Sequence, residues 1–139
     1  MTYDPNNIFA KILRREIPSH KIYEDEHTFA FMDVMPQTEG HCLVIPKQPS
    51  RNLLDADLDV LSRTMAVVQK VAKAAMKAMN AEGCQIRQYN EQAAGQTVFH
   101  LHFHILPLNT GQIVKPHSNK MADHAVLAKH AEAIRNAFG

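Results

Sequence analysis

Three of the nine histidines of this chain, His100, His102 and His104, fall within five consecutive residues. Successive side chains of a β-strand point to opposite faces, so on a strand these three would share one face. The opposite face would carry the apolar residues Leu101, Phe103 and Ile105, which should anchor the strand in a core. Imidazole serves as metal ligand, general base and nucleophile, so the run predicts a reactive surface.

Strand geometry weighs against metal ligation as the reason for all three histidines. With a rise of about 3.3 Å per residue, the Cα atoms of His100 and His104 would lie about 13 Å apart. Zn–N bonds are only about 2.0–2.1 Å long. One ion could therefore bind two neighbouring histidines and would need a further ligand, for which His41 is the obvious donor. A metal site stays open, but it leaves one histidine unexplained.

A loop that suits phosphate precedes the histidines. Gly95 allows a ligand to approach the backbone closely. Gln96, Thr97 and the loop amides offer hydrogen-bond donors to phosphate oxygens. Donors and imidazoles would meet at one end of the strand, which favours phosphate chemistry over an open sheet face with solvated histidines.

The remaining periodicities predict the elements that must position this strand. Apolar residues recur at spacings of three and four over about 57–80, which is typical of one amphipathic helix. We expect a single α+β domain over 1–139, built on about five mainly antiparallel strands. The other predicted elements are a short helix ended by Pro18, a hairpin in 21–33, strands at 41–47, 84–90 and 98–107, and a helix at about 123–138.

Composition restricts the function classes. A net charge of +1 argues against a bulk polyanion binder, so no nucleic-acid partner is predicted. No apolar run is long enough to span a membrane, and the first residues do not resemble a signal peptide. Cys42 and Cys84 sit in apolar, strand-like segments and are predicted to be free thiols. Together these features predict a cytoplasmic protein.

The run "HLHFHIL" resembles the signature of the histidine triad (HIT) family, in which three histidines alternate with apolar residues. The resemblance extends through "IFAKILRREIPSHKIYEDEHTFAFMDVMPQTEGHCLVIPK" and the "GQT" loop, so it covers roughly residues 7–107. It is strongest to the histidine triad nucleotide-binding branch. The resemblance implies a HIT-like fold and places the helix at 123–138 in a C-terminal extension.

The same resemblance implies an enzyme that acts at the α-phosphate of a nucleotide. In the family the middle histidine is the nucleophile, which here is His102. His104 would contact the phosphate and the leaving group, and His100 and His41 would complete and orient the cluster. The implied activity is that of a purine nucleoside phosphoramidase, acting on a phosphoramidate or acyl derivative of AMP through a nucleotidyl-histidine.

The resemblance also assigns binding residues and an assembly. Asp33 would take the ribose hydroxyls and Val34 would cover the base, while Asn90 would lie near the ribose and phosphate. The phosphate oxygens would be held by Gln96 and Thr97 in the loop that begins at Gly95. No cofactor or metal is implied, and the family is typically a homodimer, here through 57–80 and 84–90.

Three departures from the family pattern leave alternatives open. Some bacterial relatives carry an N-terminal Cys-x-x-Cys that helps to bind zinc, but "NNIFAKI" has no cysteine, so we expect no such zinc. "PSR" at 49–51 and Pro107 after the triad resemble the dinucleoside-polyphosphate hydrolase branch instead. Diadenosine polyphosphate hydrolysis is therefore the rival activity. Two alternatives belong to other functional classes: a nucleotide-binding module with little turnover, and a metal-dependent enzyme.

Overall fold

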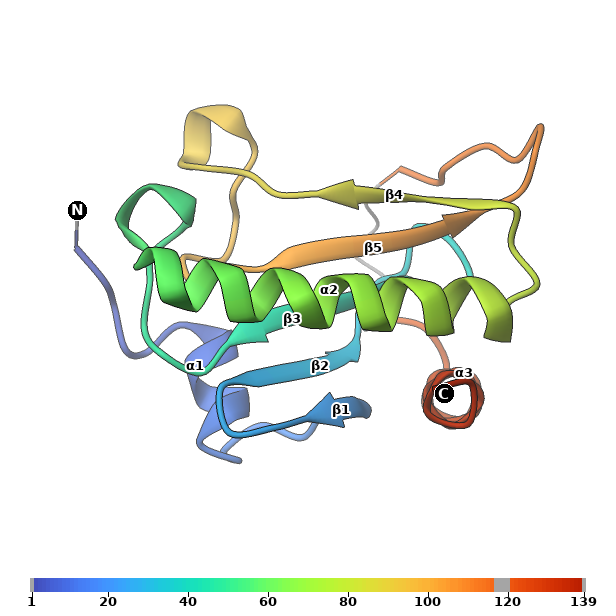
Figure 1. The fold of residues 1–139 in the computed structure, drawn as a ribbon, viewed down its shortest axis with the longest axis horizontal. Helices are drawn as coiled ribbons and strands as arrows, with labels where there is room; N and C mark the ends of the chain where they lie inside the picture. Colours follow the sequence, from blue (N-terminus) through green and yellow to red (C-terminus); the bar gives the residue numbers. More distant parts are fainter. Residues whose placement is uncertain (1, 117–120, 139) are drawn as a thin grey trace.

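Five antiparallel strands form one sheet in the computed structural model, which describes residues 2–116 and 121–138. The strand order is β1-β2-β3-β5-β4, and each neighbouring pair is antiparallel (Figure 1). The predicted α+β class and the five-stranded sheet are confirmed. The strands are β1 (Lys21–Glu24), β2 (Thr28–Met32), β3 (Cys42–Pro46), β4 (Gly83–Arg87) and β5 (Phe103–Leu108).

Helices cover both faces of this sheet. The long central helix α2 runs across one face, with α3 beside it at the β1 side, while α1 lies by the N-terminal segment (Figure 1). Asn7 and Asp123 cap α1 and α3, each accepting a hydrogen bond from a backbone N–H of the first turn. The helices are α1 (Ile8–Leu13), α2 (Leu58–Ala78) and α3 (His124–Arg135), with short 3₁₀ turns η1 (Leu53–Asp55) and η2 (Gln92–Ala94).

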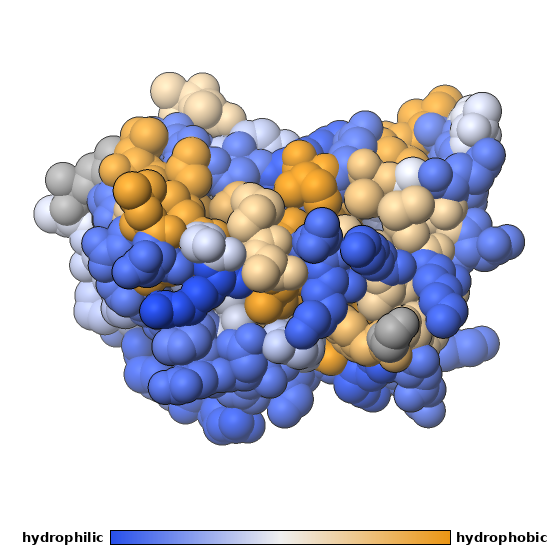
Figure 2. Space-filling model, in the orientation of Figure 1, coloured by the Kyte–Doolittle hydropathy of each residue, from blue (hydrophilic) through white to orange (hydrophobic). Residues whose placement is uncertain are grey.

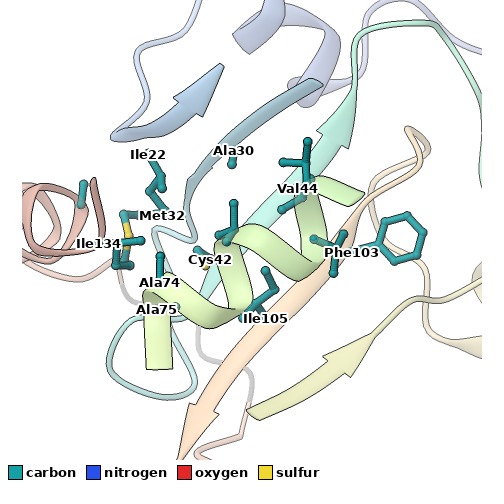
Figure 3. Packing of buried hydrophobic residues seen from close by; sticks show 14 of the residues in the cluster. Ile22, Ala30, Met32, Cys42, Val44, Ala74, Ala75, Phe103, Ile105 and Ile134 are labelled. Carbon is teal, nitrogen blue, oxygen red and sulfur yellow. The ribbon is translucent and has the colours of Figure 1, made fainter. Parts of the chain in front are cut away.

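The alternation of side chains along the strands divides the apolar residues between two cores. One core lies between the sheet and α2 with α3, and it includes Leu101, Phe103 and Ile105. Figure 3 shows Phe103 and Ile105 in this core. The second lies on the other face, where Phe9 and Ile12 of α1 pack against alternate residues of β2 and β3. The predicted anchoring of the histidine segment is thus confirmed. Full burial of one such side chain contributes about 1.5–3 kcal/mol relative to its exposure.

The histidine strand begins later than predicted. β5 starts at Phe103, so His100 and His102 precede it, and the predicted strand over 98–107 is wrong in its first half. The ladder with β3 runs from Cys42↔Ile105 to Val44↔Phe103 and stops before Pro46, which has no N–H to donate. Leu101 N–H instead donates to the Ser50 carbonyl.

Two other boundaries differ from the sequence-based expectation. α1 ends at Leu13 rather than at Pro18, because Arg15 adopts a left-handed φ of 63° that a helix cannot continue through. β4 ends at Arg87, so Asn90 lies in the following loop instead of on the predicted strand over 84–90.

The thiols and helices agree with the composition-based expectations where the structure describes them. Cys42 and Cys84 are both free, and burial raises the pKa of each thiol. Among the described residues, none of the helices combines the length and apolar character needed to cross a bilayer.

Candidate active site

The candidate site lies on the sheet face that α1 covers, opposite the α2 core. His102 and His104 alternate with the α2-facing residues, and their ring centroids are 5.0 Å apart. Phe9 of α1 packs edge-on against His102, with ring centroids 4.9 Å apart. His41 stands just before β3, and Asp33 just after β2. The antiparallel pairing of β2 with β3 brings these two together, and Asp33 N–H donates to the His41 carbonyl.

The surroundings of His102 fix its protonation pattern. Its Nδ1 lies 2.6 Å from the backbone carbonyl oxygen of His100, which can only accept a hydrogen bond. The proton of the neutral ring therefore sits on Nδ1, and Nε2 carries the lone pair. Burial lowers the pKa of His102, which favours this neutral form at physiological pH. The ring thus meets the requirement for a nitrogen nucleophile without needing a separate base.

His41 and His104 form a directed hydrogen-bond chain. The backbone N–H of Gln37 donates to His41 Nδ1 at 3.0 Å, so the His41 proton sits on Nε2. His41 Nε2 is 3.0 Å from His104 Nδ1, which must then accept. The proton of His104 is consequently on its Nε2, where this N–H can donate a hydrogen bond to a phosphate oxygen or a leaving group.

The same atoms bear on metal binding. Asp33, His41 and His104 each offer a ligand atom, and these atoms lie within 4.8 Å of one another. However, a metal at His41 Nε2 would have to displace the proton that the Gln37 N–H forces onto that nitrogen. A metal ligand needs the lone pair at the coordinating atom, so these residues fit a hydrogen-bonding chain better than a cation site.

His100 occupies a different position from the other two histidines of the run. Its Nε2 is 2.8 Å from the Pro46 carbonyl, and its Nδ1 is 2.6 Å from the Tyr3 hydroxyl. The side chain is fully buried, and burial lowers its pKa from 6.5 to about 4. Both ring nitrogens are thus engaged within the protein, so His100 acts on the site through its backbone carbonyl.

The two residues assigned to the nucleoside have unequal surroundings. Asp33 Oδ1 accepts from the Met35 N–H at 2.8 Å, while Oδ2 lies 3.4 Å from His41 Nε2 and 4.0 Å from His104 Nδ1. Asp33 therefore sits beside the histidine cluster. Val34 is partly buried against the α2 core, and its carbonyl accepts from the Ala122 N–H in the segment that leads to α3.

Gln96 is the structural centre of the loop predicted to bind phosphate. Its side chain is buried, and its amide oxygen accepts from the Glu91 N–H and from Asn52. Its amide nitrogen donates to the carbonyls of Arg51 and Val98. These four bonds use the amide fully, so in this conformation Gln96 shapes the loop and does not offer a donor to phosphate.

The rest of the loop presents backbone and a hydroxyl. Gly95 has φ of 103°, a left-handed conformation that suits glycine. The side of Gly95 where a Cβ would stand faces the ring of Tyr89. Thr97 is exposed. Asn90 accepts from the Leu53 N–H and exchanges two hydrogen bonds with Gln88, which places it between η1 and this loop.

Sequence reasoning missed two contributors to the site. Tyr3 contacts His100 across 97 residues of sequence, and no local pattern marks it. Arg51 and Glu91 form a bidentate ion pair that ties the loop after β3 to the loop before the histidines, with both N–O distances at 2.8 Å. Their opposite charges were visible in the sequence, but their pairing depends on the fold.

Comparisons with known proteins assign most of the chain to one family. The model of the HIT domain family matches residues 14–111. The adenosine 5'-monophosphoramidase HNT1 of Saccharomyces cerevisiae is 39% identical over 106 residues, covering 76% of this chain and 65% of its own. A HIT-like protein of Borreliella burgdorferi is 44% identical over 103 residues, covering 72% of this chain and 73% of its own.

A solved structure extends the likeness beyond the matched segment. The crystal structure of a HIT-like protein from Bartonella henselae superposes with a TM-score of 0.95 at 51% identity, covering 99% of this chain and 100% of that one. The likeness therefore includes the C-terminal extension as well as the histidine segment. By its sequence, its sheet and its filled histidine motif, the chain belongs to the HIT domain family.

Proposed function

We propose that this protein is a nucleotide hydrolase or transferase that cleaves AMP from a phosphoramidate or acyl derivative through a nucleotidyl-His102 intermediate. The observation that carries this proposal is the Nδ1–H of His102 held by the His100 carbonyl, which leaves Nε2 unprotonated beside His104. The name of the yeast relative, an adenosine 5'-monophosphoramidase, supports the substrate class.

In the first step His102 Nε2 attacks the α-phosphorus, and the bond from phosphorus to the leaving group breaks. The Nε2–H of His104 donates a hydrogen bond to the leaving group, a geometry that His41 supports through its hydrogen bond to His104 Nδ1, and a leaving amine takes up its proton from solvent. His102 gains positive charge, and the His100 carbonyl stabilises it. In the second step water attacks phosphorus and releases a proton to solvent, and the bond to His102 breaks, which returns His102 to its neutral form.

A nucleoside pocket is proposed beside these histidines. An opening of about 250 Å³ near α1 is lined by Ile12, Ile17 and Phe29 together with charged side chains, and none of the histidines that the structure describes lines it, so we do not assign the nucleotide to it. We assign the purine base instead to the side of α1 that faces the histidines, where Phe9 contacts His102, with Val34 beside Asp33 covering the base. Asp33 takes the ribose hydroxyls, and Asn90, Thr97 and the backbone from Gly95 to Thr97 hold the ribose and phosphate.

The surroundings of Arg51 favour this activity over diadenosine polyphosphate hydrolysis. The "PSR" segment and Pro107 resemble the polyphosphate branch, and an arginine without an acidic partner could bind additional phosphates. Here the Arg51 guanidinium pairs with both carboxylate oxygens of Glu91 and lies 4.2 Å from the Phe99 ring centroid. The positive charge of Arg51 is thus paired with Glu91 within the loop.

Turnover of two substrates tests the proposed function. We expect kcat/KM for an adenosine 5'-phosphoramidate to exceed that for diadenosine tetraphosphate by more than about tenfold, or 1.4 kcal/mol of transition-state stabilisation. The reverse preference would assign the protein to the polyphosphate branch. AMP binding in calorimetry without turnover of either substrate would indicate that the protein is a nucleotide-binding module rather than an enzyme.

We also infer that two copies associate through α2 and β4. β4 is a sheet edge, and Ile86 on it remains 45% exposed. Hydrophobic patches lie on the face of the molecule shown in Figure 2. On α2, Met65 is 46% and Leu58 82% exposed. An edge strand beside an apolar stripe suits an isologous pairing that continues the sheet across a two-fold axis.

Substituting Ile86 with arginine is expected to convert the dimer to monomer, because each copy would place an unpaired charge in the contact. Light scattering coupled to gel filtration at micromolar concentration measures the mass. Val126→Arg is the matched control, since Val126 is 46% exposed, close to the 45% of Ile86, but lies on α3 away from β4; it should leave the dimer intact. A monomeric wild-type protein would refute the assembly.

A further inference from the structure

The N-terminal segment before α1 contacts the first histidine of the triad. The Tyr3 hydroxyl lies 2.6 Å from His100 Nδ1, and the two rings meet edge-on at 5.7 Å between centroids. Arg51 donates to the Thr2 carbonyl at 3.1 Å, so two neighbouring residues of this segment are tied to the loops around the site. The contact is therefore a defined docking of the segment rather than one isolated hydrogen bond.

The direction of the hydrogen bond from Tyr3 follows from its surroundings. The Pro46 carbonyl can only accept, so His100 carries its proton on Nε2 and a lone pair on Nδ1. The Tyr3 hydroxyl must then donate. Burial raises the pKa of Tyr3, which keeps the hydroxyl protonated at neutral pH. The His100 ring is consequently held at both nitrogens and cannot flip without losing both partners.

This ring connects directly to the proposed nucleophile. The backbone carbonyl of His100 accepts the Nδ1–H of His102 at 2.6 Å, and among the described residues this is the one hydrogen bond that the ring makes. Since the side chain of His100 is fixed at both ends, its backbone and its carbonyl are fixed with it. Any displacement of the carbonyl would turn the His102 ring and move Nε2 relative to the phosphorus.

We propose that Tyr3 is a positioning residue, whose hydroxyl locks His100 so that the His100 carbonyl holds His102 in its attacking orientation. The proposal rests on the assignment of His102 as nucleophile. It distinguishes the two outer histidines of the triad: His104 donates a hydrogen bond toward the substrate, whereas His100 transmits the restraint that Tyr3 imposes. The N-terminal segment becomes part of the catalytic apparatus without contacting the reacting atoms.

Tyr3→Phe tests the proposal because it removes the hydroxyl and keeps the ring. We expect kcat to fall about 3- to 30-fold, below the roughly 100-fold that a 1 Å misplacement can cost. KM should change less than about twofold, since the lost bond does not involve the nucleotide. Tyr23→Phe is the matched control. It removes a phenolic hydrogen bond of 2.8 Å, to Asp25, far from the triad, and should leave both constants unchanged.

Nitrogen NMR of histidine-labelled protein supplies a readout that does not depend on turnover. In the wild type at pH 7, His100 should show a protonated Nε2 and a hydrogen-bonded, unprotonated Nδ1. Tyr3→Phe should shift His100 Nδ1 and His102 Nδ1, while Tyr23→Phe should shift neither. Unchanged nitrogen resonances, or an unchanged kcat in an active enzyme, would overturn the role of Tyr3. If the wild type turned over no nucleotide, the proposed function would fail, whereas the shifts would still decide whether Tyr3 holds His100.

Discussion

His102→Ala is expected to lower the release of AMP from an adenosine 5'-phosphoramidate by about 10³-fold or more, because it removes the nucleophile that divides the displacement into two steps. The substitution leaves the His41–His104 chain in place, since that chain does not include His102. The affinity for AMP should therefore change little. Initial rates with saturating substrate, together with AMP titration by calorimetry, measure the two effects separately.

The matched control for this substitution is His27→Ala. The His27 side chain is 47% exposed in the turn between β1 and β2. Because substitutions at exposed positions generally change stability little, His27→Ala should leave the rate within about twofold of the wild type. Equal turnover by His102→Ala and the wild type would contradict the assignment of the nucleophile. A similar loss in His27→Ala would point to a general effect of histidine removal and would contradict it as well.

Gln96→Leu is expected to destabilise the fold by about 3–5 kcal/mol, because each buried partner left unsatisfied costs about 1–3 kcal/mol. The leucine keeps the size of the side chain but withdraws all four amide bonds, to Glu91, Asn52, Arg51 and Val98. Urea denaturation measures the loss. In the folded fraction KM for the nucleotide should rise, because the backbone from Gly95 to Thr97 loses its support.

Gln48→Leu is the control for the glutamine substitution. Gln48 is exposed, and among the described residues its side chain makes one hydrogen bond, to Asp57, so its replacement should cost less than about 0.5 kcal/mol. A loss below about 1 kcal/mol in Gln96→Leu would contradict the structural role assigned to the buried amide. It would return Gln96 to the role that the family resemblance implies, in which its side chain contacts phosphate directly.

The fold could be predicted from the sequence because the relevant signals are local. The alternation of His102 and His104 with Phe103 and Ile105 correctly divides the segment between the site and the α2 core. The spacing of apolar residues over 57–80 likewise locates α2 within two residues of its ends. Period-two and period-three-to-four patterns record which face is buried, and burial is what the sequence encodes most directly.

The start of β5 could not be predicted from the histidine segment alone. It depends on the register with β3, which sets Val44 opposite Phe103 and leaves Pro46 beyond the end of the β3–β5 ladder. Register is fixed by distant pairing rather than by the segment itself. The sequence therefore predicts that the histidines face one way, but not that His100 lies outside the strand.

The roles of the polar side chains were harder to predict, since they depend on which partners the fold supplies. Gln96 reads as a phosphate donor in the sequence, yet its amide is consumed by four groups that lie up to 45 residues away. Asp33 and His41 are separated by a loop and meet only because β2 and β3 pair. The hydrogen-bond directions that fix the tautomers of His41, His100 and His102 likewise come from backbone groups.

The most direct test of the account is to find where the nucleotide is covalently attached during turnover. The protein is mixed with an adenosine 5'-phosphoramidate, quenched within one turnover under alkaline conditions that preserve a phosphorus–nitrogen bond, and digested for peptide mass spectrometry. The account predicts AMP on His102 in the wild type, and no adduct in His102→Ala. AMP attached to another residue, or AMP released at the wild-type rate without any protein adduct, would contradict it.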